Sequence, residues 1–244
     1  MTYCVSIVLD EGLVFCSDSR TNAGTDQVST YSKMHTFGRD GEWQVVLLSA
    51  GNLATTQAVV ARIQRDLDEE AEVNLNWLHH MNEVAEYVGR INQEELAKHT
   101  GDGMSGFMPD ASFIVGGQLG NEPPSIYLVY PQGNFITTSD ETLFLQIGET
   151  KYGKPILDRL LLNDTPIDDA AKCALVSMDS TMQSNVTVGP PIELAVCVRD
   201  ELKISRRVKL GPDDAYLISL RSGWRDLIAT SFKSLPAVRW EPGD

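Results

Sequence analysis

The stretch that decides the fold is residues 2–20, TYCVSIVLDEGLVFCSDSR. Two β-rich runs in it, 2–9 and 13–17, are separated by the turn-forming residues Asp-Glu-Gly, which predicts a hairpin. Thr2 opens the first strand and Asp18 follows the second. Because paired hairpin strands are antiparallel, the start of one lies beside the end of the other. We therefore expect Asp18 to lie close to Thr2.

Beyond this hairpin the hydrophobic period changes several times. Apolar residues spaced by three and four predict two successive helices from Leu53 and Leu78. Helices in sequential pairs between blocks of strands predict two sheets with helical layers outside them. Further strands are predicted at 34–37, 43–49, 112–115, 125–130, 144–147, 192–198, 202–208 and 215–218, further helices at about 153–162, after Pro166 and at about 220–233, and a loop at 101–109.

Length and composition indicate an ordinary globular protein. The 244 residues favour a single domain over 1–244, with about 220–244 as a C-terminal helix and tail. The 34 acidic against 20 basic residues give a net charge of −14, which argues against a nucleic-acid partner.

No membrane or export signal is visible in the sequence. Charged residues or Gly interrupt every apolar run before the roughly 18 residues that a membrane helix needs, and no signal-peptide pattern is present. The four cysteines are scattered, which is typical of buried thiols in a reducing cytosol, so a cytoplasmic location is expected. The four histidines lack metal-ligand spacing, so we expect no metal.

Thr2 is the most informative candidate for chemistry. Aminopeptidases remove Met1 before a small side chain, so we expect Thr2 to become the mature N-terminus. A terminal threonine carries a nucleophilic hydroxyl and, in its α-amine, a base with a pKa near 7.7–8.0. Met-Thr is also a common start of unrelated proteins, so this residue alone does not define a function.

Two charged residues strengthen the catalytic interpretation. Lys33 begins the strand that follows the hairpin, and Asp18 ends the hairpin. A lysine held by this aspartate would lie near the Thr2 hydroxyl, where its positive charge favours a neutral amine and a developing alkoxide. Each residue alone is more often a surface charge, so the argument depends on the hairpin bringing all three together.

Several segments together resemble the proteasome β-subunit family. In the N-terminal part these are Thr2, Ser17–Thr21 with Gly24, Lys33, Ser49–Gly51 and Thr55–Gln57. Two later segments, Ile147–Leu157 and Ser177–Pro191, are similar to its bacterial Anbu (ancestral β-subunit) branch. The resemblance covers about residues 2–220 and is most specific in the first sixty. It implies an N-terminal nucleophile hydrolase with an α+β fold, a four-layer αββα sandwich of two stacked antiparallel sheets.

The resemblance also implies catalytic roles for individual residues. Thr2 matches the nucleophile, Asp18 and Lys33 the charge pair, and Gly51 the residue whose backbone N–H forms an oxyanion hole. Asp179 matches a supporting aspartate near the nucleophile. Glycine suits the oxyanion position because a side chain would obstruct a substrate lying against the backbone.

The resemblance further implies how a peptide would bind. The substrate strand would run antiparallel between Thr21–Asn22 and Gly51, a mode that reads backbone more than side chain. Arg20 matches a structural arginine grouped with this substrate-binding segment. Ser49 falls where the family places a determinant of the specificity pocket, and a small polar side chain there gives no charge preference.

Two positions depart from the family pattern. Glu149 replaces the usual serine of a Gly-Ser-Gly stretch, and it could relay protons or pair with Lys33 and weaken it. Met182 stands where a serine is expected three residues after Asp179, with Ser180 and Ser184 only nearby. The expected catalytic trio is intact, whereas the shell that supports it is altered.

Three functions remain open from the sequence. The first is a threonine-type peptidase or amidase, the second a non-catalytic assembly or binding subunit, and the third an amide-transferring enzyme acting with ATP-grasp or transglutaminase-like partners. The resemblance implies a peptide or protein substrate, no cofactor, and a homo-oligomer of ring or open-spiral type. No ATPase partner can be read from the sequence. Trp224 and Trp240 are candidates for packing or for a subunit contact.

Overall fold

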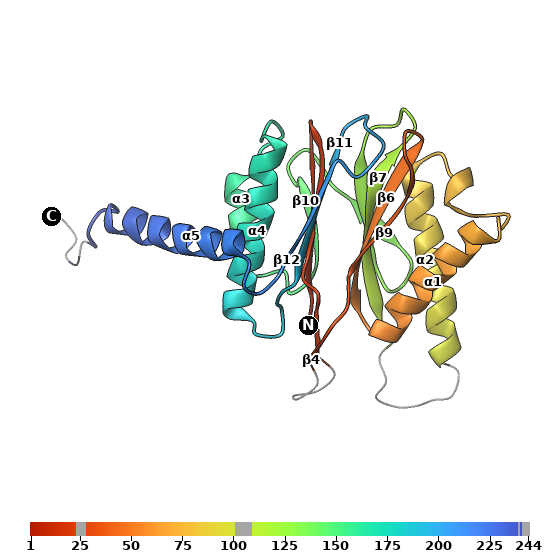
Figure 1. The fold of residues 1–244 in the computed structure, drawn as a ribbon, viewed down its shortest axis with the longest axis horizontal. Helices are drawn as coiled ribbons and strands as arrows, with labels where there is room; N and C mark the ends of the chain where they lie inside the picture. The colour runs from red at the N-terminus through yellow and green to blue at the C-terminus, as the bar shows by residue number, and fades with distance from the viewer. Residues whose placement is uncertain (23–27, 101–108, 239, 241–244) are drawn as a thin grey trace.

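The computed structural model describes residues 1–244 apart from 23–27, 101–108, 239 and 241–244. Two five-stranded antiparallel sheets are stacked face to face, with helices on both outer sides (Figure 1). This is the α+β sandwich expected from the sequence. The first sheet has the order β10 (Phe144–Gly148), β1 (Tyr3–Leu9), β2 (Gly12–Ser17), β11 (Ile192–Val198), β12 (Arg206–Leu210), and the second the order β5 (Met34–Arg39), β6 (Trp43–Gly51), β7 (Ala111–Leu119), β8 (Ser125–Val129), β9 (Phe135–Thr137).

Helices cover each sheet in pairs. The second sheet is covered by α1 (Leu53–Asp68) and α2 (Met81–Thr100), which are joined through the short 3₁₀ helix η1 (Leu75–Trp77). The first sheet is covered by α3 (Lys154–Leu160) and α4 (Ile167–Ser184), and α5 (Ala215–Lys233) projects away from this layer (Figure 1). Three apolar cores result: one between the sheets, and one between each sheet and its helices.

Burial on both faces explains the continuous apolar runs of the central strands. All six residues of β2 are buried, as are the first eight of β6. A strand between a helix layer and a second sheet has no solvent face, so it does not need alternating polar residues. For this reason the N-terminal hairpin can be predicted from the sequence.

The predicted hairpin is confirmed. Strand β1 pairs with β2 in antiparallel register, with Cys4 opposite Ser17 and Leu9 opposite Gly12. Gly12 has φ +143, and a Cβ there would collide with the backbone of β11, so the turn requires glycine. The pairing continues beyond the strand ends, because the Asp18 amide donates to the Tyr3 carbonyl at 3.2 Å.

The strand expected at 215–218 is wrong, because these residues form the first turn of α5. The Asp214 side chain accepts hydrogen bonds from the amides of Tyr216 and Leu217 and caps the helix there. The short strands β3 (Arg20–Asn22), β4 (Val28–Thr30) and β9 were not predicted. Apart from Pro109, the loop expected at 101–109 lies outside the described residues. No helix in the described part of the chain is long and apolar enough to cross a membrane.

Candidate active site

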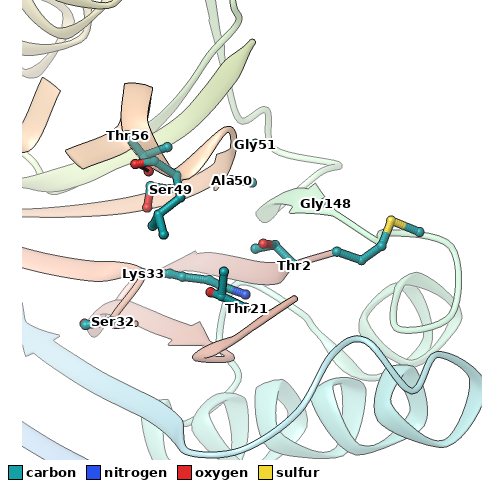
Figure 2. A pocket seen from close by; sticks show the side chains of 11 residues that line it. Thr2, Thr21, Ser32, Lys33, Ser49, Ala50, Gly51, Thr56 and Gly148 are labelled. Atoms are coloured by element: carbon teal, nitrogen blue, oxygen red, sulfur yellow. Dashed lines mark hydrogen bonds between the residues drawn. The ribbon is translucent and has the colours of Figure 1, made fainter. Parts of the chain in front are cut away.

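The ends of several strands surround a cavity of about 290 Å³ that contains Thr2. In Figure 2, Gly148 and Gly51 lie on one side of Thr2, and Lys33 and Thr21 lie on the other. The described lining residues are Met1, Thr2, Thr21, Ser32, Lys33, Ser49, Ala50, Gly51, Leu53, Thr56 and Gly148. Five residues implied to be catalytic or substrate-binding therefore line one cavity: Thr2, Thr21, Lys33, Ser49 and Gly51.

The backbone holds Thr2 at the edge of the first sheet. Its carbonyl oxygen accepts a 2.7 Å hydrogen bond from the Glu149 amide, directly after the pairing of Tyr3 with Gly148. Gly148 has φ +84, and a Cβ there would collide with the Thr2 carbonyl. The close approach of β10 to the N-terminal strand therefore depends on glycine at this position.

The side chain of Tyr3 fixes the start of β1 to neighbouring elements. Its side chain is fully buried, and its hydroxyl lies 2.5 Å from Ser177 Oγ and 2.6 Å from Gln146 Nε2, which donates to it. Burial raises the pKa of the Tyr3 hydroxyl well above its usual range, so it stays protonated. This network ties the residue after Thr2 to both α4 and β10.

Asp18 and Lys33 form a buried ion pair beside Thr2. Lys33 Nζ donates to Asp18 Oδ1 at 2.7 Å and to the Arg20 carbonyl at 2.7 Å. Asp18 also accepts from the Tyr3 amide at 3.1 Å and from the Gly189 amide at 3.2 Å. The carboxylate is fully buried and Lys33 is 7% exposed, so neighbouring groups fix both charges in position.

The electrostatics of this pair are set by burial. Desolvation raises the pKa of the Asp18 carboxyl above its ordinary value, and the Lys33 charge and the two backbone amides oppose that rise. A buried carboxylate without these partners would be costly to ionise. Lys33 is therefore the cation that balances Asp18 and faces the Thr2 cavity.

Gly51 ends β6 with φ +114, at the rim of the cavity. A Cβ there would collide with the Asp110 carbonyl oxygen, which itself accepts a 2.9 Å bond from the Asn52 amide. The Asn52 side chain then caps α1 by accepting from the amides of Ala54 and Thr55. The backbone at this rim is therefore fixed by the end of β6, by Gly51 and by the Asn52 cap of α1.

The residues implied to bind substrate have different positions. Thr21 and Ser49 line the cavity. Asn22 ends β3, and its side chain lies outside the described part of the structure. Arg20 does not line the cavity: its guanidinium donates to the Val186 carbonyl at 2.6 Å, which fits a structural role.

Asp179, implied by the resemblance to support the nucleophile, is not among the described residues that line the Thr2 cavity. It is an α4 residue, and its Oδ1 accepts a 2.6 Å hydrogen bond from Arg221 of α5. Met182, at the place expected for a serine, packs against the core between α4 and the first sheet. This face of α4 is thus used for packing and for holding α5.

Glu149 does not pair with Lys33 in the structure. Its carboxylate is 8% exposed, accepts a 2.8 Å bond from Asn185 Nδ2, and lies 3.6 Å from Lys151 Nζ. Sequence reasoning missed Asn185, because nothing in the spacing of 36 residues signals this contact. It also missed Ser32, whose hydroxyl lines the cavity and donates to Glu193 at 2.9 Å.

The described residues contain no group of three or more His, Cys, Asp or Glu side chains placed to hold a metal ion. The four cysteines are buried and free, and burial raises the pKa of Cys173 to about 11, so it is a poor nucleophile.

The stacked sheets, the paired helices and the threonine at the start of β1 define a proteasome-type fold. A family profile described as "Proteasome subunit" matches residues 2–197. The chain belongs to the proteasome subunit family and, within it, to the Anbu (ancestral β-subunit) group.

Solved structures place it in that group. "Anbu (ancestral beta-subunit) from Yersinia bercovieri" is 40% identical, with 98% of this chain and 100% of that chain covered and a TM-score of 0.93. "Helical Assembly of the Anbu Complex from Pseudomonas aeruginosa" is 43% identical, with coverage of 98% and 99% and a TM-score of 0.93. Anbu from Hyphomicrobium sp. strain MC1 is 40% identical, with coverage of 98% and 100% and a TM-score of 0.90. A comparison with curated protein sequences finds no match.

Replacing Gly51 with Ala is expected to impair acylation of Thr2 by about 100-fold. The new Cβ would collide with the Asp110 carbonyl and push the backbone away from a φ that alanine rarely adopts. Gly41→Ala is the matched control, since Gly41 also has positive φ but its Cβ would meet open space. Labelling of Thr2 by an electrophilic peptide checks this: equal loss of rate in both variants would contradict a specific role for Gly51.

Proposed function

We propose that this protein is a threonine-type peptidase or amidase in which Thr2, exposed by removal of Met1, is the nucleophile. The observation that carries the proposal is the buried Asp18–Lys33 pair at the cavity that contains Thr2. A cation fixed at this place favours the neutral α-amine and the alkoxide that develops during attack. The contribution of Lys33 to this stabilisation is large because the charges of Lys33 and Asp18 are both buried and fixed away from water.

The mechanism uses only groups of this chain and a water molecule. The Thr2 α-amine takes the hydroxyl proton while Oγ bonds to the substrate carbonyl carbon, and the Gly51 N–H stabilises the oxyanion. The ammonium returns the proton to the departing nitrogen as the carbon–nitrogen bond breaks. Water then adds to the ester carbon, the bond to Oγ breaks, and the acid leaves with Thr2 restored.

The cavity suits a peptide held by its backbone. The edge of β3 at Thr21 and the end of β6 at Gly51 lie on opposite sides of the Thr2 cavity, so an extended chain between them could pair with both. Ser49 and Ser32 offer hydroxyls and no net charge to a substrate side chain. We therefore expect no charge preference for the side chain before the cleaved bond. We also propose that the protein acts in the cytoplasm.

Fluorophore release from a panel of peptide amides tests the proposal. Turnover that an epoxyketone abolishes supports it, because this inhibitor class needs both the hydroxyl and the free amine of a terminal threonine. Turnover insensitive to the epoxyketone would assign the activity to another group and would contradict the proposal.

A non-catalytic binding subunit is the second candidate. It is favoured by the departures from the family pattern: Asp179 is bound by Arg221, Met182 lies against the core, and Glu149 is held by Asn185. Groups outside the catalytic trio often decide the rate of an enzyme. An amide-transferring enzyme shares the acyl-enzyme step and differs only in using an amine in place of water.

We also propose that the chain assembles into a homo-oligomer, of ring or open-spiral type. One of the similar structures is described as a helical assembly. In this chain α5 projects from the body and buries only Leu217, whereas Leu227 is 64% and Phe232 72% exposed. Exposed apolar surface of this kind is typical of subunit contacts.

Two features of α5 favour another copy of this chain as its partner. A Cβ at Gly223 would meet open space, so packing within the subunit does not explain a glycine that costs a helix about 1 kcal/mol relative to Ala. Close approach of a second helix would explain it. The helix also carries Arg221, Arg225 and Lys233 against one acid, Asp226, so it would attract an acidic surface of another copy of this chain, whose net charge is −14.

Replacing Phe232 with Asp is expected to dissociate the assembly. A carboxylate buried in an apolar contact without a partner is strongly unfavourable, so the sedimentation coefficient at micromolar concentration should fall toward that of a smaller species. Val73→Asp, at a 44% exposed apolar residue distant in sequence, is the control. An unchanged sedimentation coefficient for Phe232→Asp would exclude this end of α5 from the contact.

A further inference from the structure

A second cavity of about 360 Å³ adjoins the Thr2 cavity. The two share Ala50, Gly51 and Gly148 as a common wall. The second lies where the ends of β6, β8 and β10 and the start of β7 meet, at the open edge between the two sheets. Neither Thr21 nor Lys33 contributes to it. Thus Gly51 and Gly148 separate two compartments, and Thr2 belongs to the first.

The position of this wall fits the geometry of acyl transfer. When Thr2 Oγ bonds to a carbonyl carbon held at Gly51, the acyl part extends into the cavity lined by Thr21 and Ser49. The nitrogen part is attached to the same carbon and must leave in another direction. In Figure 2 the Gly51 and Gly148 side of Thr2 is opposite the Lys33 and Thr21 side. The second cavity lies on the Gly51 and Gly148 side of Thr2, because both glycines line it.

The chemistry of the second cavity differs from that of the first. Among the described residues that line it, Asp110 carries the only formal charge, and Ser112, Tyr130, Gln146 and Thr150 contribute hydroxyls or an amide. Asp110 is exposed, whereas Lys33 in the first cavity is already paired with Asp18. A cationic group would therefore be attracted to the second cavity and an anionic group repelled.

We propose that this second cavity binds the part of the substrate that follows the cleaved bond, and that Asp110 makes it prefer a basic side chain there. The inference rests on the proposed function and deepens it. By microscopic reversibility, an amine bound in the same cavity is placed to attack the acyl-enzyme. In that step its nitrogen bonds to the acyl carbon, the bond to Thr2 Oγ breaks, and the amine proton passes through the Thr2 α-amine to Oγ. The cavity is thus also the acceptor site for an amide transfer to a neutral amine on a molecule that carries its positive charge on a separate group.

Paired peptides test the preference. Two internally quenched peptides, identical except for Lys or Glu directly after the cleaved bond, are compared at low ionic strength. The wild type is expected to show kcat/KM about fivefold higher for the Lys peptide, the size of a partly exposed ion pair. In Asp110→Asn the ratio should fall to about one, while Asp213→Asn, the same charge change at an exposed site outside both cavities, should keep it. A wild-type ratio near one, or a ratio unchanged by Asp110→Asn, would overturn the inference.

A binding measurement separates this inference from the proposed function. Lysinamide is titrated into the Thr2→Ala protein, and the backbone amide NMR signals of Gly51 and Gly148 are followed. The inference predicts shifts in this protein that are lost when Asp110→Asn is added and retained with Asp213→Asn. Absence of shifts would overturn it even if the wild type hydrolyses peptides. If lysinamide causes these shifts but an epoxyketone does not label the wild type, the amine site is retained and the peptidase proposal is contradicted.

Discussion

Thr2→Ala is expected to lower turnover of any peptide substrate at least about 1,000-fold, to the background rate. The variant lacks the oxygen that must bond to the substrate carbonyl, and no other described hydroxyl in the cavity has an amine on the same residue. Thermal stability should barely change, because Thr2 is held through its carbonyl, which alanine retains. The measurement is kcat/KM for the best peptide of the panel, together with a thermal melt.

Thr2→Ser is the matched variant for this prediction. Serine keeps the hydroxyl and the α-amine and loses only a methyl group, so it should retain measurable turnover. Unchanged turnover in Thr2→Ala would contradict the assignment of the nucleophile. Equal loss in both variants, with an unchanged melt, would also contradict it, because the hydroxyl would then not be the group that matters.

Lys33→Met is expected to destabilise the protein by about 3–5 kcal/mol, the usual cost of leaving one member of a buried ion pair without its partner. Asp18 is fully buried, and its remaining partners would be the Tyr3 and Gly189 amides. For a chain of this size the melting temperature should fall by about 10 °C. Acylation of Thr2 should also slow by about 100-fold, because the fixed cation near the nucleophile is lost.

Two further variants separate these effects. Lys154→Met removes a lysine from an exposed ion pair with Asp158 and should change stability by less than about 1 kcal/mol. Adding Asp18→Asn to Lys33→Met removes the uncompensated charge and should recover part of the stability but none of the acylation rate. If Lys33→Met melts like the wild type, the ion pair does not have the structural role assigned to it.

The central strands and the grouping of Thr2, Asp18 and Lys33 could be predicted because their signals are local or simple. Burial on both faces makes β1 and β2 continuous apolar runs, and a tight turn fixes their register. Register then determines which residue lies beside Thr2, so Asp18 follows from the hairpin alone. Lys33 was selected from its place at the start of the next strand, and the resemblance to a family added Gly51; the structure joins both in one cavity.

The remainder of the site depends on contacts between distant segments. Asn185 reaches Glu149 because α4 ends beside the turn after β10. The hydrophobic period of the sequence does not predict this contact. The contact of Asp179 with α5 could not be predicted, because motif spacing gives a position along a helix but not the direction its side chain takes. In the structure Arg221 of α5 determines its contact. The strand predicted at 215–218 failed for a local reason, since the cap at Asp214 outweighs the β-rich composition.

The most direct test of the central claim is the intact mass of the purified protein with and without a peptide epoxyketone. The account predicts a mass lacking Met1 that increases by one inhibitor molecule, and no increase in Thr2→Ala. A mass that still includes Met1, or one that lacks it and does not shift with the epoxyketone, would contradict a free and reactive Thr2.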